Sequence, residues 1–309
     1  MAVLFVPCFN EAVTIAKVVG DFRRVLPNAA IHVYDNNSSD GTAANAHDAG
    51  AIVRTETRQG KGAVVRRMFA DIDADIYVMT DGDDTYDAAS APALIELLVS
   101  GPLDLVNGAR ETDIAAAFRP GHRFGNRLLT GLVDRIFGAD VNDMLSGYKI
   151  FSRRYVKSFP AMSTGFEIET ELIVHALEMR LPIAEVATPY RVRAEGSSSK
   201  LHTFRDGFRI LRLIVQLVKE ERPIQFFGLL GAIAGTIAIV LGTSVVIEFV
   251  ETGLVPRLPT AVFATGRERL AALLAFFSGL ILETVTRGRR EIKRLAYLAL
   301  APPGCDDES

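Results

Sequence analysis

Asp81-Gly82-Asp83 sets two carboxylates two residues apart, directly after the short apolar run Ile76–Thr80. That run predicts a buried strand. Carboxylates at the C-terminal end of a strand in an α/β sheet point into the crevice where ligands usually bind. Hard oxygen ligands suit Mg²⁺ or Mn²⁺, and Mg²⁺ sites commonly combine one or two carboxylates with substrate phosphates. The spacing therefore predicts a metal–diphosphate site with Asp81 and Asp83 as catalytic residues and metal ligands.

An acidic pair after a strand can also have a purely structural role. An isolated Asp-x-Asp often marks only a solvated turn or a helix cap, and that alternative stays open. A calcium-binding EF-hand loop does not fit, because Tyr86 stands where that loop needs glycine and Pro92 where it needs a bidentate glutamate. The metal–diphosphate interpretation therefore depends on the polar residues that follow the neighbouring predicted strands.

Three further polar segments lie at predicted strand-to-helix junctions. Val6–Ala12 ends the first strand and Asp35–Thr42 follows the second, and capping or Asx-turn chemistry explains either segment taken alone. Gly60-Lys61-Gly62 opens a helix, where backbone N–H groups and a cation could lie against a phosphate. Val65 replaces the third glycine of a dinucleotide-binding fingerprint, and no Walker-type sequence is present, so a nucleotide triphosphatase is not expected.

The elements that position these residues alternate between short apolar runs and helical periodicity as far as about residue 190. The predicted strands are Val3–Val6, Ile31–Tyr34, Ile52–Arg54, Ile76–Thr80, Leu103–Asn107, Tyr148–Phe151 and Ala184–Pro189. The predicted helices include Val13–Leu26, Ala43–Ala49, Ala63–Ile72, Ala91–Val99, Phe124–Phe137 and Glu167–Met179. This alternation predicts an α/β fold in which helices cover both faces of a mainly parallel sheet.

Length, charge and cysteine content narrow the class of protein. The chain has 309 residues and a net charge of −3, which leaves room for one substantial domain plus an addition and does not indicate nucleic-acid binding. Cys8 and Cys305 lie at opposite ends of the chain and form no disulfide framework or metal-ligand spacing. Met1 leads directly into the first strand, so no signal peptide is expected.

The C-terminal third is more apolar than the rest. Leu201–Glu221 has apolar residues at helical spacing with basic residues between them, which is typical of a helix on a membrane surface; a helix packed on the sheet domain is the alternative. Phe226–Ile247 contains no charged residue and is long enough to cross a bilayer. Leu258–Leu282 is also apolar but contains Arg267-Glu268-Arg269, so a second crossing either starts near this triplet or turns it toward protein.

Basic residues flank the N-terminal end of the first apolar segment and the C-terminal end of the second. Lys219 and Arg222 precede the first, and five basic residues follow the second: Arg287, Arg289, Arg290, Lys293 and Arg294. By the positive-inside rule both flanks are cytoplasmic and Glu248–Arg257 is a short external loop. A helical hairpin buried in protein is the alternative.

Taken in order, these segments resemble the family-two glycosyltransferases of GT-A fold, from about Val3 to Lys200. They look most like the branch that moves a sugar from a nucleotide diphosphate to polyprenyl phosphate, such as dolichol-phosphate mannose synthases and bacterial lipid-phosphate glucosyltransferases. The C-terminal hairpin matches bacterial and archaeal members of that branch. The motifs that carry the resemblance are P-x-F-N-E at Pro7–Glu11, D-N-N-S-S-D-G-T at Asp35–Thr42, G-K-G, D-G-D, Asp143 with Ser146-Gly147-Tyr148-Lys149, and Gly196-Ser197-Ser198-Ser199-Lys200.

The resemblance implies roles for these residues in holding a nucleotide sugar. Asp81 would contact ribose or sugar, and Asp83 would ligate the metal that bridges the diphosphate. Thr85 falls where the mannose synthases carry Gln and is given no role. The nucleoside would be held by Pro7, Glu11, Asp35 and Asn36, the last standing where many relatives have a second Asp.

Further residues would act on the acceptor and the phosphates. Arg110 would contact the sugar or the acceptor phosphate, and Asp143 lies where the family approaches the acceptor. Glu167 and Glu169 fit sugar-binding or helix-capping roles equally well. The remaining substrate-binding residues are expected to be Lys61, Lys149, Arg191, Arg193, Ser198 and Lys200, of which the last four belong to or flank a Ser-rich loop suited to closing over phosphates.

The chain is therefore expected to be an inverting, Mg²⁺- or Mn²⁺-dependent glycosyltransferase that moves a hexose, glucose or N-acetylhexosamine being favoured, from a UDP-sugar to polyprenyl phosphate. A lipid phosphate, with its second pKa near ~6, is largely ionised at neutral pH, so Asp143 is expected to orient rather than to act as an obligatory base. The alternatives are mannosyl transfer from GDP-mannose and a non-catalytic scaffold that binds nucleotide sugar. A hydroxyl-acceptor synthase is disfavoured, because the chain has no Trp and so lacks Q-x-x-R-W.

The expected domains follow from the same reasoning. They are a GT-A catalytic domain (1–200), an amphipathic juxtamembrane helix (201–222), a two-helix transmembrane hairpin (223–286) and a cytoplasmic basic tail (287–309). The expected location is the inner or cytoplasmic membrane, with the catalytic domain in the cytosol. The expected partners are the nucleotide sugar, the lipid phosphate and the bilayer; whether the chain forms a homo-oligomer stays open.

Overall fold

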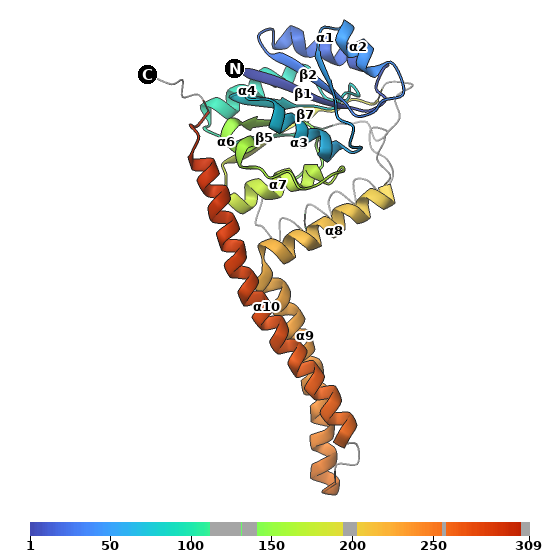
Figure 1. Cartoon of the computed structure of the whole chain (residues 1–309), viewed down its shortest axis with the longest axis vertical. Coiled ribbons are helices and arrows are strands. Elements are labelled where there is room, and N and C mark those ends of the chain that lie inside the picture. The colour runs from blue at the N-terminus through green and yellow to red at the C-terminus, as the bar shows by residue number, and fades with distance from the viewer. Residues whose placement is uncertain (112–130, 132–140, 194–202, 255–257, 304–309) are drawn as a thin grey trace. The chain divides into compact units, whose positions relative to one another are not determined.

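A computed structural model of the chain describes residues 1–111, 131, 141–193, 203–254 and 258–303. The predicted helix Phe124–Phe137, apart from residue 131, and the expected substrate residues Ser198 and Lys200 lie outside the described residues. The described part contains a seven-stranded sheet with helices packed against it and, toward the C-terminus, three long helices (Figure 1).

The sheet has the strand order β3-β2-β1-β4-β6-β5-β7. Neighbouring strands are parallel except at β6, which is antiparallel to both β4 and β5. The predicted α/β fold and all seven predicted strands are confirmed, with ends that differ by a few residues. The strands are β1 Ala2–Cys8, β2 Ala30–Asp35, β3 Ile52–Thr55, β4 Ile76–Met79, β5 Leu105–Glu111, β6 Lys149–Ser152 and β7 Ile183–Pro189.

Helices cover both faces of the sheet. One face carries α1 (Ile15–Val25), α2 (Thr42–Asp48) and, after the 3₁₀ turn η1 (Ala88–Ser90), α4 (Ala91–Ser100). The other carries α3 (Lys61–Asp71), α6 (Arg153–Ser158) and α7 (Ile168–Met179), of which α6 was not predicted. This three-layer arrangement follows from β1, whose successive side chains alternate between the faces and are buried on both.

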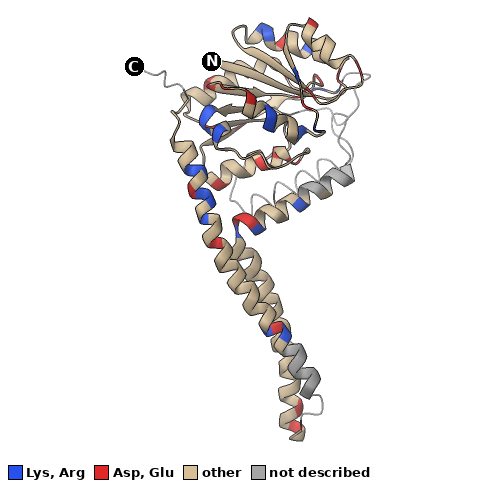
Figure 2. Cartoon of the chain, in the orientation of Figure 1, with Lys and Arg blue, Asp and Glu red and all other residues tan. Residues whose placement is uncertain are grey.

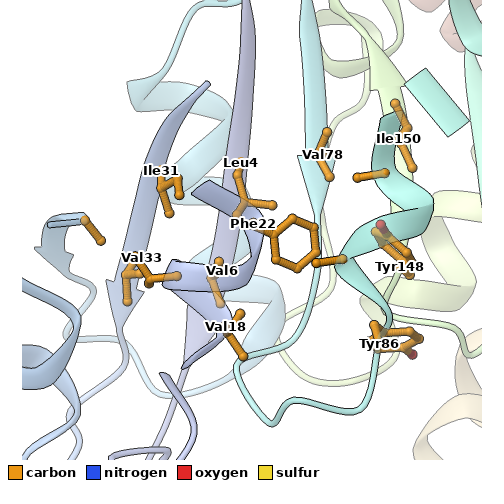
Figure 3. Packing of buried hydrophobic residues seen from close by; sticks show 14 of the residues in the cluster. Leu4, Val6, Val18, Phe22, Ile31, Val33, Val78, Tyr86, Tyr148 and Ile150 are labelled. Atoms are coloured by element: carbon orange, nitrogen blue, oxygen red, sulfur yellow. The ribbon is translucent and has the colours of Figure 1, made fainter. Parts of the chain in front are cut away.

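The core on the α1 face is mainly aliphatic and also includes the rings of Phe22, Tyr86 and Tyr148. Leu4 and Val6 of β1 pack with Val18 and Phe22 of α1, and Figure 3 shows the Phe22 ring among them. Its centroid lies 6.2 Å from the ring of Tyr148, edge to face. Burying one such side chain contributes about 1.5–3 kcal/mol.

The core on the opposite face is aromatic, with Phe69 of α3 at its centre. The Phe69 ring lies 5.9 Å from Phe5 of β1 and 6.3 Å from Tyr77 of β4. It is also 5.7 Å from Phe151 and 6.1 Å from Phe159. These contacts hold α3, and with it the start of α3 at Lys61, against the centre of the sheet.

The strand order reverses at β1. From β1 the chain adds β2 and then β3 on one side, and returns to place β4 on the other. Ligands of open α/β sheets bind beyond the carboxyl ends of the strands at such a reversal. Cys8, Asp35 and Met79 end the three strands around it, so Asp81 and Asp83 follow a strand that lies directly at the reversal.

The chain divides into two compact units. One comprises Met1–Arg212 and Lys293–Ser309, and the other Leu213–Ile292. The three C-terminal helices are α8 (Thr203–Glu221), α9 (Pro223–Thr252) and α10 (Leu258–Leu298). Within the described residues, two stretches are long and apolar enough to cross a membrane: α9, with 30 residues, and Gly266–Leu298 of α10, with 33. In Figure 2, a long part of each of these two helices carries no Lys, Arg, Asp or Glu.

The segment after residue 286 differs from the expected basic tail, because α10 continues through it to Leu298. Its last turns belong to the same unit as the sheet. Lys293 forms an ion pair with Glu178 at 2.7 Å, and the Tyr297 hydroxyl donates to buried Asp104 at 2.8 Å. These partners fix the helix end, which the basic composition alone did not reveal.

Candidate active site

Four acidic side chains gather where β1 ends. The buried Cys8 thiol has a pKa well above its ordinary value, first because of burial and then because of the charges of Glu11, Asp81, Asp35 and Asp83. One strand end thus lies within the electrostatic reach of all four carboxylates. The first three come from different strand-to-helix junctions, so the sheet reversal brings them together.

Asp83 is buried and each of its carboxylate oxygens has a partner. Oδ1 accepts hydrogen bonds from the Thr85 hydroxyl at 2.6 Å and the Thr85 backbone N–H at 3.2 Å. Oδ2 forms an ion pair with Nη2 of Arg193. Burial, and then the charge of Asp81, raise the pKa of Asp83 despite the opposing charge of Arg193. Negative charge at this position is therefore costly and would be relieved by a further cation.

Asp81 has a different cation partner. Its Oδ1 lies 2.5 Å from Nζ of Lys61, and the same Nζ lies 2.5 Å from Oε1 of Glu169 on α7. Burial lowers the pKa of Lys61, but Asp81 and Glu169 together raise it above its ordinary value, so the ammonium stays charged. Gly147 closes the other side, where an added Cβ would lie 2.5 Å from Oδ2 of Asp81. No residue other than glycine fits there without moving that carboxylate.

The start of α3 does not form the phosphate cradle expected from Gly60-Lys61-Gly62. The N–H of Gly62 donates to the carbonyl of Gly165 at 3.1 Å, and that of Ala63 to Thr164 at 3.3 Å and to Gly60 at 3.0 Å. A Cβ on Gly62 would lie 2.4 Å from the Ser163 carbonyl oxygen. The glycines instead allow residues 163–165 to pack on the helix start, which corrects the expectation.

Asp35 presents an unused acceptor. Its Oδ2 accepts from the N–H of Ser38 at 3.1 Å, whereas its Oδ1 is buried and has no partner in the described part of the chain. Unpaired buried carboxylate oxygens are uncommon and call for a ligand or water. The nucleoside role expected of Asp35, Glu11 and Pro7 stays a prediction.

The Asn36 side chain is hydrogen-bonded within the protein, and its expected nucleoside contact stays a prediction. Its amide donates to the carbonyls of Glu56 at 2.7 Å and Arg58 at 2.8 Å, and its Oδ1 accepts from the N–H of Gly60 at 2.7 Å. Both amide hydrogens are thereby used. These hydrogen bonds tie the Asn36 side chain to the loop before α3. The amide cannot donate to a nucleobase unless they break.

Arg110 and Asp143 form a bidentate ion pair. Nε and Nη2 of Arg110 lie 2.7 and 2.6 Å from the two carboxylate oxygens, and the Arg110 N–H donates to Oδ2 at 3.1 Å. The guanidinium also lies 5.6 Å from the ring centre of Tyr190. Burial raises the pKa of Asp143, but the Arg110 hydrogen bonds lower it below its ordinary value. Asp143 is thus held as an ionised, oriented carboxylate.

The Lys149 side chain lies in the protein interior, and its expected contact with substrate stays a prediction. Strand β6 turns its side chain into the interior, where it is fully buried and Nζ donates to Oδ1 of Asn107 at 2.6 Å. Burial lowers its pKa to about 8. Asn107 in turn donates to the Asp143 carbonyl at 2.9 Å, so Lys149 supports the backbone of Asp143.

Residues 189–193 run alongside the acidic loop. Tyr190 forms an isolated antiparallel bridge with Tyr86, and the Arg191 N–H donates to the Thr85 carbonyl at 2.8 Å. The Arg191 guanidinium is exposed and pairs with Asp87 at 2.6 Å. Arg193, two residues on, pairs with Asp83. The two arginines that the sequence pointed to therefore meet different acids of one loop.

The donor set fits a divalent cation that also binds a diphosphate. In the described residues, no group of three or more His, Cys, Asp and Glu side chains is placed to hold a metal ion. Asp81 and Asp83 supply two carboxylates, and burial followed by the charge of Asp81 raises the pKa of Asp83. Mg²⁺ typically uses one or two carboxylates and takes its other ligands from phosphate and water. The site fits that requirement and not an all-protein metal cage.

Two further residues shape the site without having been predicted. Glu185 of β7 accepts from the backbone N–H groups of Asn142 at 2.9 Å and Asp143 at 3.1 Å, and thereby fixes the Asp143 loop. The Tyr86 hydroxyl accepts from the N–H of Gly147 at 2.6 Å. Glu185 stands in an ordinary strand pattern and gave no signal. Tyr86 stands three residues after Asp83, close enough to the acidic motif for an aromatic residue to be noticed.

The sequence matches known proteins over most of its length. The family profile described as glycosyl transferase family 2 matches residues 3–159. Glycosyltransferase AglJ of Haloferax volcanii is 34% identical over 303 residues, which cover 96% of this chain and 97% of that protein. Dolichyl-phosphate hexose transferase of the same organism is 32% identical over 215 residues, 69% of this chain and 92% of that protein.

The fold also matches solved structures. Glucosyl-3-phosphoglycerate synthase of Mycobacterium tuberculosis, crystallised with Mn²⁺, uridine diphosphate and glucosyl-3-phosphoglycerate, superposes with a TM-score of 0.58 at 25% identity. The match covers 71% of this chain and 79% of that one. A TM-score of this size over most of the chain supports the same arrangement of strands and helices.

Proposed function

The chain belongs to glycosyl transferase family 2, and on that premise we propose that it transfers a hexose from a nucleotide-diphosphate sugar to polyprenyl phosphate at the cytosolic face of a membrane. One observation carries the proposal. The acidic pair Asp81 and Asp83 follows β4 at the reversal of the sheet, in a chain that also has two helices able to cross a membrane. A soluble acceptor would not require those helices.

For the donor, we propose a UDP-linked sugar, either glucose or an N-acetylhexosamine. The Haloferax volcanii relative is named as a hexose transferase acting on dolichyl phosphate, and the solved structure contains uridine diphosphate and Mn²⁺. The unpartnered, buried Oδ1 of Asp35, within the described residues, offers an acceptor for an N–H or O–H group of the nucleoside.

The acceptor phosphate attacks the anomeric carbon of the sugar. A new bond forms between that carbon and a phosphate oxygen, the bond to the diphosphate breaks, and the nucleoside diphosphate leaves with the electron pair. Configuration at the carbon inverts. The ionised phosphate brings no proton that must be removed, which agrees with Asp143 being tied to Arg110 rather than held as a base.

The residues of the chain supply orientation and charge. Arg110, fixed by Asp143, presents a guanidinium edge to an anionic group of the sugar or the acceptor. Lys61 and Glu169 hold the Asp81 carboxylate in one orientation. Arg193 offers a second guanidinium, whose Nη1 is buried without a partner in the described residues. When bound, Mg²⁺ or Mn²⁺ held by Asp83 and Asp81 would neutralise charge on the departing diphosphate.

Replacement of Asp83 tests the proposal. In Asp83→Ala, we expect transfer from UDP-glucose or UDP-N-acetylglucosamine to a short polyprenyl phosphate to fall at least about a hundredfold, since a charge-stabilising group is lost. The measurement is formation of lipid-linked radiolabelled sugar by the full-length chain in detergent, with and without Mn²⁺. GDP-mannose is included as a donor, and its exclusive use would replace the donor assignment.

Asp84→Asn is the matched control. Asp84 adjoins Asp83 but has a backbone φ of 59°, which Asn tolerates, and it pairs on the surface with Lys17. We expect near wild-type transfer. Equal turnover in Asp83→Ala and the wild-type chain would end the proposal. Nucleotide binding without turnover for any donor would point to a scaffold.

A further inference from the structure

The two carboxylates of the acidic motif have unequal cation partners. Lys61, the partner of Asp81, has a side chain only 8% exposed and is held from behind by Glu169 at 2.5 Å. Arg193, the partner of Asp83, has a side chain 31% exposed. One cation is therefore built into the core, and the other reaches the site from its edge.

The Arg193 guanidinium pairs with the Asp83 carboxylate oxygen to which a metal ion would bind. Oδ1 of Asp83 already accepts two hydrogen bonds from Thr85, so Oδ2 is the oxygen that Arg193 holds. A cation that ligates Oδ2 competes with the guanidinium for that oxygen, because two positive charges at contact distance repel each other. Leaving Asp83 with no cation would be costly, since an unpaired buried charge is strongly destabilising.

The exchange requires little movement of the backbone. The Arg191 N–H is bonded to the Thr85 carbonyl, and Tyr190 is bridged to Tyr86, so this segment is fixed to the loop that carries Asp83. Arg193 lies two residues beyond that attachment. Because an arginine side chain has several rotatable bonds, it can leave Asp83 without movement of the attached backbone.

We infer that Arg193 is an internal substitute for the divalent cation: it neutralises Asp83 when no nucleotide is bound and gives up that carboxylate when a divalent ion arrives with a nucleoside diphosphate. The inference rests on the proposed function. The displaced guanidinium, which also has an unpartnered buried Nη1 in the described part of the chain, then becomes available to the phosphates. Binding of the divalent ion without nucleotide is thereby disfavoured. The ion must compete with Arg193, and no phosphate is present to pair with the displaced guanidinium.

The test is Mn²⁺ binding to the full-length, nucleotide-free chain, measured by the electron paramagnetic resonance signal of free Mn²⁺. We expect Arg193→Gln to bind Mn²⁺ about tenfold more tightly than the wild-type chain, because the competing charge is gone. Arg193→Lys keeps a cation and should bind like wild type. Lys17→Gln is the control, since that exposed lysine pairs with Asp84, the neighbour of Asp83, and it should leave Mn²⁺ affinity within about twofold of wild type.

A second measurement uses thermal unfolding in the same detergent. A ligand that binds the folded state stabilises it more as its affinity rises, so Mn²⁺ should raise the midpoint of Arg193→Gln more than that of wild type. Unchanged or weaker Mn²⁺ binding in Arg193→Gln, with a folded chain, would overturn the inference. If the wild-type chain binds no Mn²⁺ even with UDP present, the proposed function fails instead, so the two failures are distinguishable.

Discussion

Charge compensation decides what individual residues do at this site. Lys61 and Lys149 are both buried, yet one is paired with two carboxylates and keeps its proton, whereas the other has an amide partner and a pKa lowered to about 8. The sequence predicts that both touch substrate. Buried lysines in this chain hold the acidic residues of the site from the protein interior. A lysine within a sequence motif therefore does not necessarily contact a substrate.

Glu169 should act on the site through Lys61. In Glu169→Gln, the whole charge of Lys61 is directed at Asp81, so less negative potential remains for a cation and its diphosphate. We expect the affinity for Mn²⁺ with UDP to fall about tenfold, a change of ~1.4 kcal/mol, measured by calorimetry. Glu167→Gln is the control, because the Glu167 carboxylate accepts from the Gly165 N–H at 3.0 Å, within its own loop. Equal affinities in both variants would contradict the positioning role.

At the scale of elements, the helix α7 links the site to the aromatic core. Its first turn contains Glu169, and one face further along carries His175. The His175 ring packs edge to face on Tyr155 at 5.4 Å, and its Nε2 lies 3.2 Å from the Ser158 hydroxyl. Burial, and then the charge of Lys293, lower the pKa of His175 to about 3, against the opposing effect of Glu178. The folded chain therefore keeps this ring neutral.

His175 should make the fold sensitive to acid. Between its ordinary pKa of 6.5 and about 3 the unfolded chain binds a proton that the folded chain does not. Stability is therefore lost as pH falls below 6.5, by at most about 1.4 kcal/mol per pH unit. In His175→Phe, which keeps a ring, this contribution is absent. Thermal midpoints measured between roughly neutral pH and pH ~5 should fall less in the variant, and parallel curves would refute this assignment.

At the scale of the whole molecule, the chain returns to its first unit after the apolar helices. Residues from Lys293 onward belong to the same compact unit as Met1–Arg212. Within this unit, the Asp104 carboxylate connects the end of α10 to the sheet. That carboxylate is fully buried and accepts from Ser152, Arg154 and Tyr297. The end of α10 is thus part of the unit that contains the site.

Loss of this connection should destabilise the unit that carries the sheet. In the wild-type chain the Arg154 guanidinium lies 4.7 Å from the centre of the Tyr297 ring. Tyr297→Phe keeps that ring but loses the hydrogen bond to Asp104. We expect a loss of about 1–2 kcal/mol, seen as a lower thermal midpoint of the nucleotide-free chain. Leu298→Ala, at an exposed neighbouring position, should change little. A midpoint equal to wild type would show that the hydrogen bond is unimportant.

The sequence by itself determined the order of the elements and the family. The alternation of apolar runs and helical periodicity is local, so it predicted all seven strands, and the long apolar stretches predicted α9 and the first part of α10 for the same reason. The acidic motif was equally local: Asp81, Asp83 and Asp35 could be named from their position after a strand.

Only the tertiary structure decided the partners of these residues. Glu169 meets Lys61 across 108 positions of sequence, Arg193 meets Asp83, and Lys149 is turned inward by the antiparallel placement of β6. The Asn36 side chain and the backbone at Gly60 and Gly62 prove to be hydrogen-bonded to other segments of the chain. Such pairings depend on strand order and register, which bring distant residues together. No short stretch of sequence contains that information.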